Sequence, residues 1–226
     1  MENIADLFLL RKDITFLNFG SFGATPAPIF DAYQKWQRVL EAEPVQYIVF
    51  DGPGYLQTSR EALANYIGVA DKDDLVFVTN PSFAVNMVAK NFPLQPGDQI
   101  LTTDIEYGAC DRTWEYYCAQ KGAEYVKQKI TLPITSKEKF IEEFFAGITP
   151  KTKAVFISHI TSATALKLPV HEICAIAKQK GLITFVDGAH GPAQTEVDLA
   201  TLQADFYTGA CHKWMMAPKG CSFLYA

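Results

Sequence analysis

The segment Ala204-Asp-Phe-Tyr-Thr-Gly-Ala-Cys-His-Lys-Trp214 follows a shorter apolar run that ends in an acid, Phe185-Val-Asp-Gly-Ala-His190. Most lysines are solvated surface charges, but Lys213 follows a turn of small residues and precedes an aromatic residue and two methionines. Burial in such surroundings lowers the pKa of an amine and favours the neutral form that makes imines. An acid at the end of a buried strand can pair with a pyridinium nitrogen. The two segments therefore indicate pyridoxal 5'-phosphate, held as a Schiff base on Lys213, with Asp187 at the ring nitrogen.

Strand-like apolar runs alternate with amphipathic helical stretches on both sides of these segments. Seven strands are expected, at Leu75–Thr79, Gln99–Thr103, Glu124–Ile130, Lys153–Ser158, Leu182–Asp187, Asp205–Thr208 and Cys221–Tyr225. Helices are expected between them at Ser82–Asn91, Gly108–Lys121, Ser136–Phe145 and Val170–Lys180. This alternation predicts an α/β fold with three layers, α/β/α, around a mostly parallel seven-stranded sheet.

The first part of the chain has a different pattern. A glycine-rich turn segment, Leu17-Asn-Phe-Gly-Ser-Phe-Gly23, precedes two helical stretches at about 29–41 and 56–67. Asp51-Gly-Pro-Gly54 between them is typical of a turn. We therefore divide the chain into an N-terminal segment, 1–55, and a large domain, 56–226.

Composition narrows the function classes. The 226 residues are 49% apolar and 20% charged with a net charge of −5, as in globular proteins, and no basic tract suggests nucleic acid or an anionic membrane. No apolar run approaches the ~20 residues that span a bilayer. The acidic start of the chain lacks the pattern of a secretory signal, so a cytoplasmic location is expected. The five cysteines show no paired or zinc-like spacing and are expected to be free thiols.

Ligands of such sheets bind beyond the carboxyl ends of the strands, where several polar groups are expected to meet. Ser82 could hold a phosphate at a helix start or act as a plain N-cap. Tyr107 could stack on a planar cofactor or simply pack. Asp187 could bind a metal, but with four histidines in the chain and no carboxylate partner nearby we expect no metal site. His190 and His212 could border the same site.

Six collinear stretches carry a family resemblance. They are Leu17–Gly23, Thr79–Asn86, Thr103–Ala109, Ser158–Thr164, Phe185–His190 and Ala204–Trp214. Together they resemble the class V aminotransferase family of fold-type I pyridoxal-phosphate enzymes, in its isopenicillin N epimerase-like and cysteine desulfurase-like branch. The resemblance implies an enzyme that acts on amino acids by epimerase, transaminase or lyase chemistry, through a Lys213 internal aldimine. It also implies a homodimer.

The resemblance assigns roles to individual residues. Lys213, Asp187 and His190 would be catalytic, with His190 near the cofactor's 3-hydroxyl. The cofactor would also be held by Ser82, Phe83, Tyr107, Thr161, Ser162 and His212. The substrate entrance would be lined by Asn18, Gly20 and Ser21, and segment 1–55 would make dimer contacts.

The chain also departs from the family pattern. Phe19, Ile105, Ala165 and Ala210 stand where relatives often have other residues. Family members continue well beyond the lysine into a small C-terminal domain that binds the substrate carboxylate, and we expect this domain to be missing here. One alternative is therefore a non-catalytic remnant of the fold or an interaction module. A Rossmann-like nucleotide-binding protein is a weaker alternative, because no GxGxxG follows the first strand.

Overall fold

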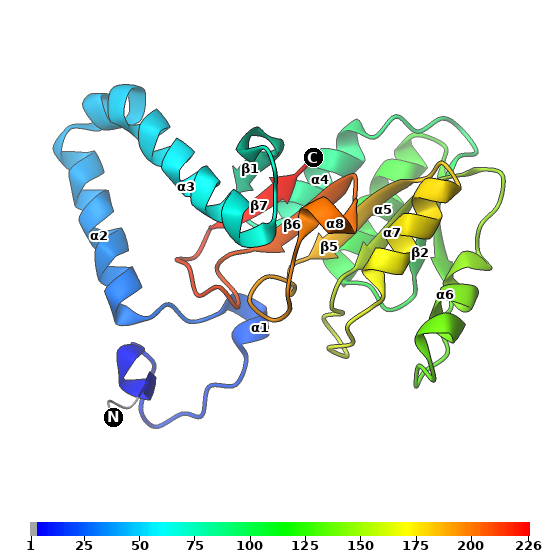
Figure 1. Ribbon diagram of the computed structural model, residues 1–226, viewed down its shortest axis with the longest axis horizontal. Coiled ribbons are helices and arrows are strands. Elements are labelled where there is room, and N and C mark those ends of the chain that lie inside the picture. Colours follow the sequence, from blue (N-terminus) through cyan, green and yellow to red (C-terminus); the bar gives the residue numbers. More distant parts are fainter. Residues whose placement is uncertain (1–3) are drawn as a thin grey trace.

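The computed structural model describes residues 4–226 and contains one seven-stranded sheet (Figure 1). The strands are β1 (Leu75–Val78), β2 (Gln99–Thr103), β3 (Glu124–Gln128), β4 (Thr152–Ser158), β5 (Ile183–Gly188), β6 (Phe206–Ala210) and β7 (Ser222–Tyr225). Their order across the sheet is β1-β7-β6-β5-β4-β2-β3. All seven predicted strands are present, with ends that differ from the prediction by at most two residues.

The sheet is mostly parallel, as predicted. The pairs β2–β3, β2–β4, β4–β5 and β5–β6 are parallel, whereas β7 runs antiparallel to both β1 and β6. The register aligns Ser158 with Asp187, and Asp187 with Thr208. The carboxyl ends of the three central strands therefore lie side by side, which brings the polar groups behind them to one edge of the sheet.

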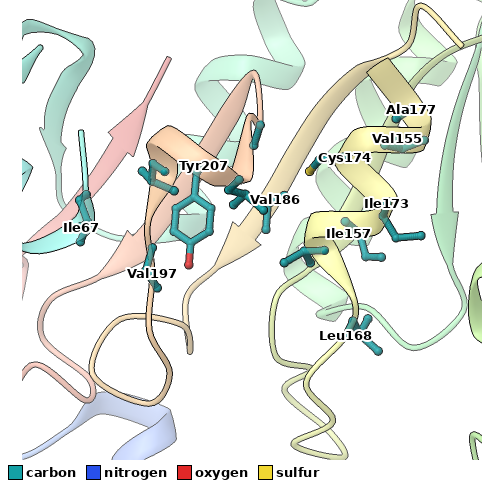
Figure 2. Close-up of a cluster of buried hydrophobic side chains, with 14 of the residues drawn as sticks. Ile67, Val155, Ile157, Leu168, Ile173, Cys174, Ala177, Val186, Val197 and Tyr207 are labelled. Carbon is teal, nitrogen blue, oxygen red and sulfur yellow. The ribbon is translucent and has the colours of Figure 1, made fainter. Parts of the chain in front are cut away.

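Helices cover both faces of the sheet. The helices of the large domain are α4 (Pro81–Asn91), α5 (Gly108–Gln120), α6 (Lys137–Phe145), α7 (Val170–Gln179) and α8 (Leu199–Leu202). Side chains alternate along β4, because successive residues of a strand point to opposite faces. Val155 and Ile157 join the core under α6, α7 and α8, part of which is drawn in Figure 2, whereas Ala154 and Phe156 join the core under α4 and α5. The predicted three-layer arrangement is confirmed.

The N-terminal part contains α1 (Phe19–Phe22), α2 (Ala27–Ala42), a π-helical stretch (Gln46–Asp51) and α3 (Gly52–Ile67). The predicted turn at 51–54 is wrong, because α3 begins there. Its first helical positions hold Gly52 and Pro53, where the missing proline N–H needs no partner. Only the end of α3 is buried, whereas α2 has no buried residue and extends away from the sheet (Figure 1). Helix α3 continues across the predicted boundary between the N-terminal segment and the large domain. The division of the chain at residues 55 and 56 therefore stays a prediction.

Candidate functional site

A cavity of about 240 Å³ lies at the carboxyl edge of the sheet. It is lined by residues from five strand ends and from the N-terminal segment: Ser21, Phe22, Asn80, Pro81, Ser82, Tyr107, Ser158, Ile160, Ser162, Asp187, Ala189, His190, His212 and Lys213. Eight of these were predicted as site residues from the sequence, namely Ser21, Ser82, Tyr107, Ser162, Asp187, His190, His212 and Lys213. The fold therefore brings most of the predicted site into one cavity.

Lys213 lies in the loop that joins β6 to β7, and its amine faces His190. Its Nζ lies 3.3 Å from His190 Nε2, and the Trp214 indole donates a hydrogen bond to His190 Nδ1 at 3.2 Å. An indole N–H is only a donor, so Nδ1 carries no proton and a neutral His190 has its proton on Nε2. Burial lowers the pKa of Lys213 below its usual value, although Asp187 opposes the shift. Burial likewise lowers the pKa of His190 to about 4. Burial therefore disfavours the charged form of both groups, and the Nε2 proton of a neutral His190 points the imidazole donor toward the amine.

Asp187 is the buried carboxylate of the site. Its Oδ1 accepts a hydrogen bond from the Ala189 N–H at 3.0 Å, and its Oδ2 accepts one from Cys110 Sγ at 3.4 Å. Burial raises the pKa of Asp187 above its usual value, and the Lys213 charge only partly offsets this. A cationic partner in the cavity would lower that pKa again, because an opposite charge favours the ionised carboxylate. Asp187 is thus suited to pair with a protonated ring nitrogen.

The start of α4 forms the part of the cavity that suits an anion. The N-cap of this helix is Asn80, whose side chain accepts from the Phe83 N–H at 2.8 Å. The capping alternative for Ser82 is therefore wrong, and Ser82 lies on the cavity wall. His212 Nδ1 donates a hydrogen bond to the Cys221 carbonyl oxygen at 3.0 Å. The other ring nitrogen, Nε2, takes no part in this bond. Burial lowers the pKa of His212, but a bound dianion would favour protonation of its ring.

Tyr107 is about half exposed at the cavity mouth, with 47% of its surface accessible. The preceding residue, Glu106, fixes its backbone to the sheet. Glu106 accepts a hydrogen bond from Thr103 Oγ1 at 2.7 Å and accepts from both the backbone N–H and the hydroxyl of Ser158. These contacts tie the β2–α5 turn, and with it the backbone before Tyr107, to the end of β4.

The N-terminal segment completes the cavity. Ser21 and Phe22 reach its wall, and Gly20 lies against His190 and Trp214. The adjoining Gly23 packs directly on the backbone of the lysine loop. The turn that was predicted to line the substrate entrance therefore contacts His190 and the loop that carries His212 and Lys213.

Four predicted site residues are not among those that line the cavity, and Gly20, which lies against His190 and Trp214, is one of them. Asn18 caps α1, because its side chain accepts from the Ser21 N–H at 3.1 Å. The Phe83 side chain is 51% exposed. The Thr161 hydroxyl lies 2.7 Å from the Thr164 hydroxyl and accepts from the Leu166 N–H, so it stabilises its own turn. Local hydrogen bonding thus accounts for Asn18 and Thr161.

Three residues with direct roles in the geometry were not assigned from the sequence. Glu106 lies inside a quoted motif, and its charge directly before Tyr107 is a signal that could have identified it. Cys110 stands one turn into α5, on the side that faces Asp187, but nothing in its sequence neighbourhood distinguishes it from a core cysteine. Asn80 could have been identified as the N-cap, because a proline at the first helical position follows the cap.

We expect Glu106→Gln to change the pH dependence of stability. Burial raises the pKa of Glu106 to about 7, against its hydrogen bonds from Ser158 and Thr103, and Asp187 adds to the rise. A raised pKa means that the folded protein keeps a proton that the unfolded chain releases. The free energy of unfolding of the native protein should therefore fall by ~3 kcal/mol between about pH 4.5 and pH 7 through this group alone.

Urea unfolding at several pH values measures this effect. The Gln variant should lack that fall, and the difference between the two proteins should be constant above about pH 7. Glu138→Gln, at an exposed position on α6, is the matched control. Parallel pH profiles for the native protein and Glu106→Gln would contradict the assignment.

Comparison with known proteins adds to this geometry. The family model described as aminotransferase class-V matches residues 53–226. The chain belongs to this family. An isopenicillin N epimerase from Amycolatopsis lactamdurans is 38% identical over 226 residues, which is 99% of this chain and 56% of the relative. The L-cysteine desulfhydrase-like protein lolT1 from Epichloe uncinata is 27% identical and matches 97% of this chain and 48% of its own length.

A solved structure with the same fold is a mutant of the protein C-DES, with glycine covalently linked to its pyridoxal phosphate cofactor. It matches with a TM-score of 0.82 and 23% identity, over 95% of this chain and 57% of that protein. The chain spans about half the length of the curated relatives it matches. The fold and family that the sequence indicated are thus confirmed.

Proposed function

We propose that this chain binds pyridoxal 5'-phosphate in the cavity through Lys213 and forms the cofactor-binding part of an enzyme that acts on amino acids. One observation carries the proposal: three groups line the same cavity. They are the buried carboxylate of Asp187, the amine of Lys213, whose pKa burial lowers, and the start of α4, which suits an anion. These three groups match the three polar parts of this cofactor, namely its ring nitrogen, its aldehyde and its phosphate. The residues present therefore fit the group.

Each residue has a task in this proposal. The N-terminal amides of α4, the Ser82 hydroxyl and His212 would hold the phosphate. Asp187 would keep a proton on the ring nitrogen, and His190 would lie near the 3-hydroxyl. Tyr107 would cover the ring and limit the access of water. When bound, pyridoxal phosphate withdraws electrons from the α-carbon of an attached amino acid.

Lys213 would have a second task as a base. Because burial favours its neutral form, its Nζ can accept the proton of a substrate α-carbon once a substrate amine has replaced it on the cofactor. Return of that proton to the α-carbon serves epimerisation, and its delivery elsewhere serves transamination or elimination. The similarity to an epimerase and to a desulfhydrase-like protein supports this shared proton transfer.

Borohydride reduction tests the cofactor assignment. Protein mixed with pyridoxal phosphate should show a visible absorbance band, and reduction should fix the cofactor to the peptide that contains Lys213. Mass spectrometry then locates the added group. Folded protein that gives no band and no fixed cofactor would refute the proposal and favour a non-catalytic remnant.

We also propose that two copies of the chain associate through the N-terminal segment. Its helices expose large apolar side chains, among them Trp36, Ile48, Val49 and Phe50, and α2 contacts little of the large domain. Contiguous exposed apolar surface of this kind marks interaction sites. Sedimentation should show a dimer that Trp36→Glu weakens, whereas a monomer at all concentrations would contradict it.

Among residues 4–226, no helix is both long enough and apolar enough to cross a bilayer. We propose a cytoplasmic location, which cell fractionation would measure.

A further inference from the structure

Two cysteines face each other at the neck of the loop that carries Lys213. The antiparallel pairing of β6 and β7 ends at Ala210 and Ser222, and Cys211 and Cys221 are the residues immediately beyond this pair. The Cys221 carbonyl oxygen accepts from the His212 N–H at 3.1 Å, and the Cys211 carbonyl oxygen accepts from the Ala217 N–H at 3.0 Å. Backbone hydrogen bonds thus hold both residues at the base of the loop.

The spacing of opposed residues suits a disulfide. Directly opposed residues of antiparallel strands have Cα atoms about 4.5–5.5 Å apart. Disulfides span Cα separations of about 4.4–6.8 Å. The two side chains also meet, because a hydrogen bond between the thiols raises the pKa of Cys211 and lowers the pKa of Cys221. Both sulfurs are unoxidised in the structure.

We propose that Cys211 and Cys221 form a reactive dithiol, which low-molecular-weight disulfides oxidise to an intramolecular bond across the neck of the lysine loop. Cys221 is the entry point, because it is partly exposed whereas Cys211 is buried. The lowered pKa of Cys221 supports this order, since the thiolate is the nucleophile in thiol–disulfide exchange.

The exchange balances with oxidised glutathione as the oxidant. The Cys221 thiolate attacks one sulfur of glutathione disulfide, which forms a mixed disulfide and releases one glutathione thiolate. Once Cys221 is part of the mixed disulfide, its thiol no longer raises the pKa of Cys211, so Cys211 gives up its proton to solvent and attacks the Cys221 sulfur. The Cys211–Cys221 bond forms, and a second glutathione thiolate leaves. Each chain loses two electrons, and these reduce one glutathione disulfide to two glutathione molecules.

The other three cysteines of the chain provide internal controls. Cys110, Cys118 and Cys174 are at most 1% exposed. Burial raises the pKa of Cys118 to about 11 and that of Cys174 to about 12, and it also raises the pKa of Cys110. Their thiols therefore lack both access and thiolate character, and the native protein is expected to leave them reduced.

The loop that this bond would close contains the site lysine. His212 and Lys213 follow Cys211 directly, and the His212 ring lies against the Cys221 carbonyl. A covalent bond between Cys211 and Cys221 would fix the two ends of the loop relative to one another. The state of the two thiols is thereby linked to the segment that carries Lys213.

Tryptic mapping of the full chain tests the proposal. Folded protein is incubated with oxidised glutathione, quenched with acid, alkylated and digested. Trypsin cuts after Lys213 and after Lys219, so the two cysteines leave on separate peptides unless a disulfide joins them. We expect a linked pair formed by the peptide that ends at Lys213 and the peptide that begins at Gly220, with the three core cysteines alkylated only after denaturation.

Serine variants separate the two steps. Cys211→Ser should stop at a stable glutathione adduct on Cys221, whereas Cys221→Ser should stay unmodified because Cys211 is buried. Cys118→Ser should form the linked pair as the native protein does. Native protein that stays fully reduced, or that stops at the glutathione adduct, would overturn the proposal. The reaction needs no pyridoxal phosphate, so its outcome is separate from that of the cofactor assignment.

Discussion

Lys213→Ala is expected to abolish covalent attachment of pyridoxal phosphate while the protein stays folded. The change removes the amine that faces His190 in the cavity and leaves Asp187 and the start of α4 in place. Some cofactor should still bind without a covalent bond, through its phosphate and its ring nitrogen. The visible band and the borohydride-fixed cofactor should both disappear. Any proton exchange at a substrate α-carbon should fall by about 10²-fold or more, since it loses its base.

The stability of this variant distinguishes a lost function from a lost fold. Burial disfavours the charged form of Lys213, as its lowered pKa shows. Removal of this amine should therefore leave the free energy of unfolding at neutral pH unchanged or slightly raised. Lys219→Ala, at an exposed position in the same loop, is the matched control and should keep the band and the fixed cofactor. Fixed cofactor in the Lys213→Ala protein would show that another lysine holds it.

The sequence was sufficient to predict the large domain and most of the cavity. Strands alternate with helices along the chain, and parallel strands place their carboxyl ends at one edge of the sheet. The order of strands and helices alone therefore predicts that Ser82, Asp187 and Lys213 meet at this edge. The backbone conformation of Ala165 is a second feature that relates to the sequence pattern. The resemblance implied a departure from the family pattern at this position, and its φ of 54° is in the left-handed region that glycine adopts most easily.

The features that the sequence did not predict depend on which hydrogen-bond partner a side chain takes in the folded protein. The Thr161 hydroxyl could reach the cavity in principle, but its own turn takes it up. The carboxylate of Glu106 binds Ser158, which lies on a strand far away in the chain, so its role depends on the order of strands in the sheet. Gly52 and Pro53 were predicted to form a turn, but the proline lies in the first positions of α3, where a helix tolerates it. Each of these outcomes requires contacts between segments that spacing along the chain does not specify.

Gly23→Ala is expected to separate the N-terminal segment from the lysine loop. Gly23 has a φ of 64°, and a Cβ there would lie 2.1 Å from the His212 carbonyl oxygen and 2.5 Å from that of Lys213. These are backbone atoms, so no side-chain rotation can relieve the clash. The segment must move, and with it Ser21 and Phe22 leave the cavity wall. Phe19, which stacks on Trp214, should move as well.

The expected result is a loss of cofactor affinity together with a loss of stability. We expect pyridoxal phosphate to bind about 10-fold more weakly, equal to about 1.4 kcal/mol, because the loop that carries Lys213 and His212 loses its support. A non-glycine residue in the left-handed region costs roughly 1–2 kcal/mol in any surroundings. Gly97→Ala isolates this strain, because Gly97 has a φ of 85° and nothing lies within 4 Å of an added Cβ. Titration with the cofactor and urea unfolding compare the two variants. If both lose the same stability and both bind the cofactor like the native protein, the N-terminal segment does not support the lysine loop.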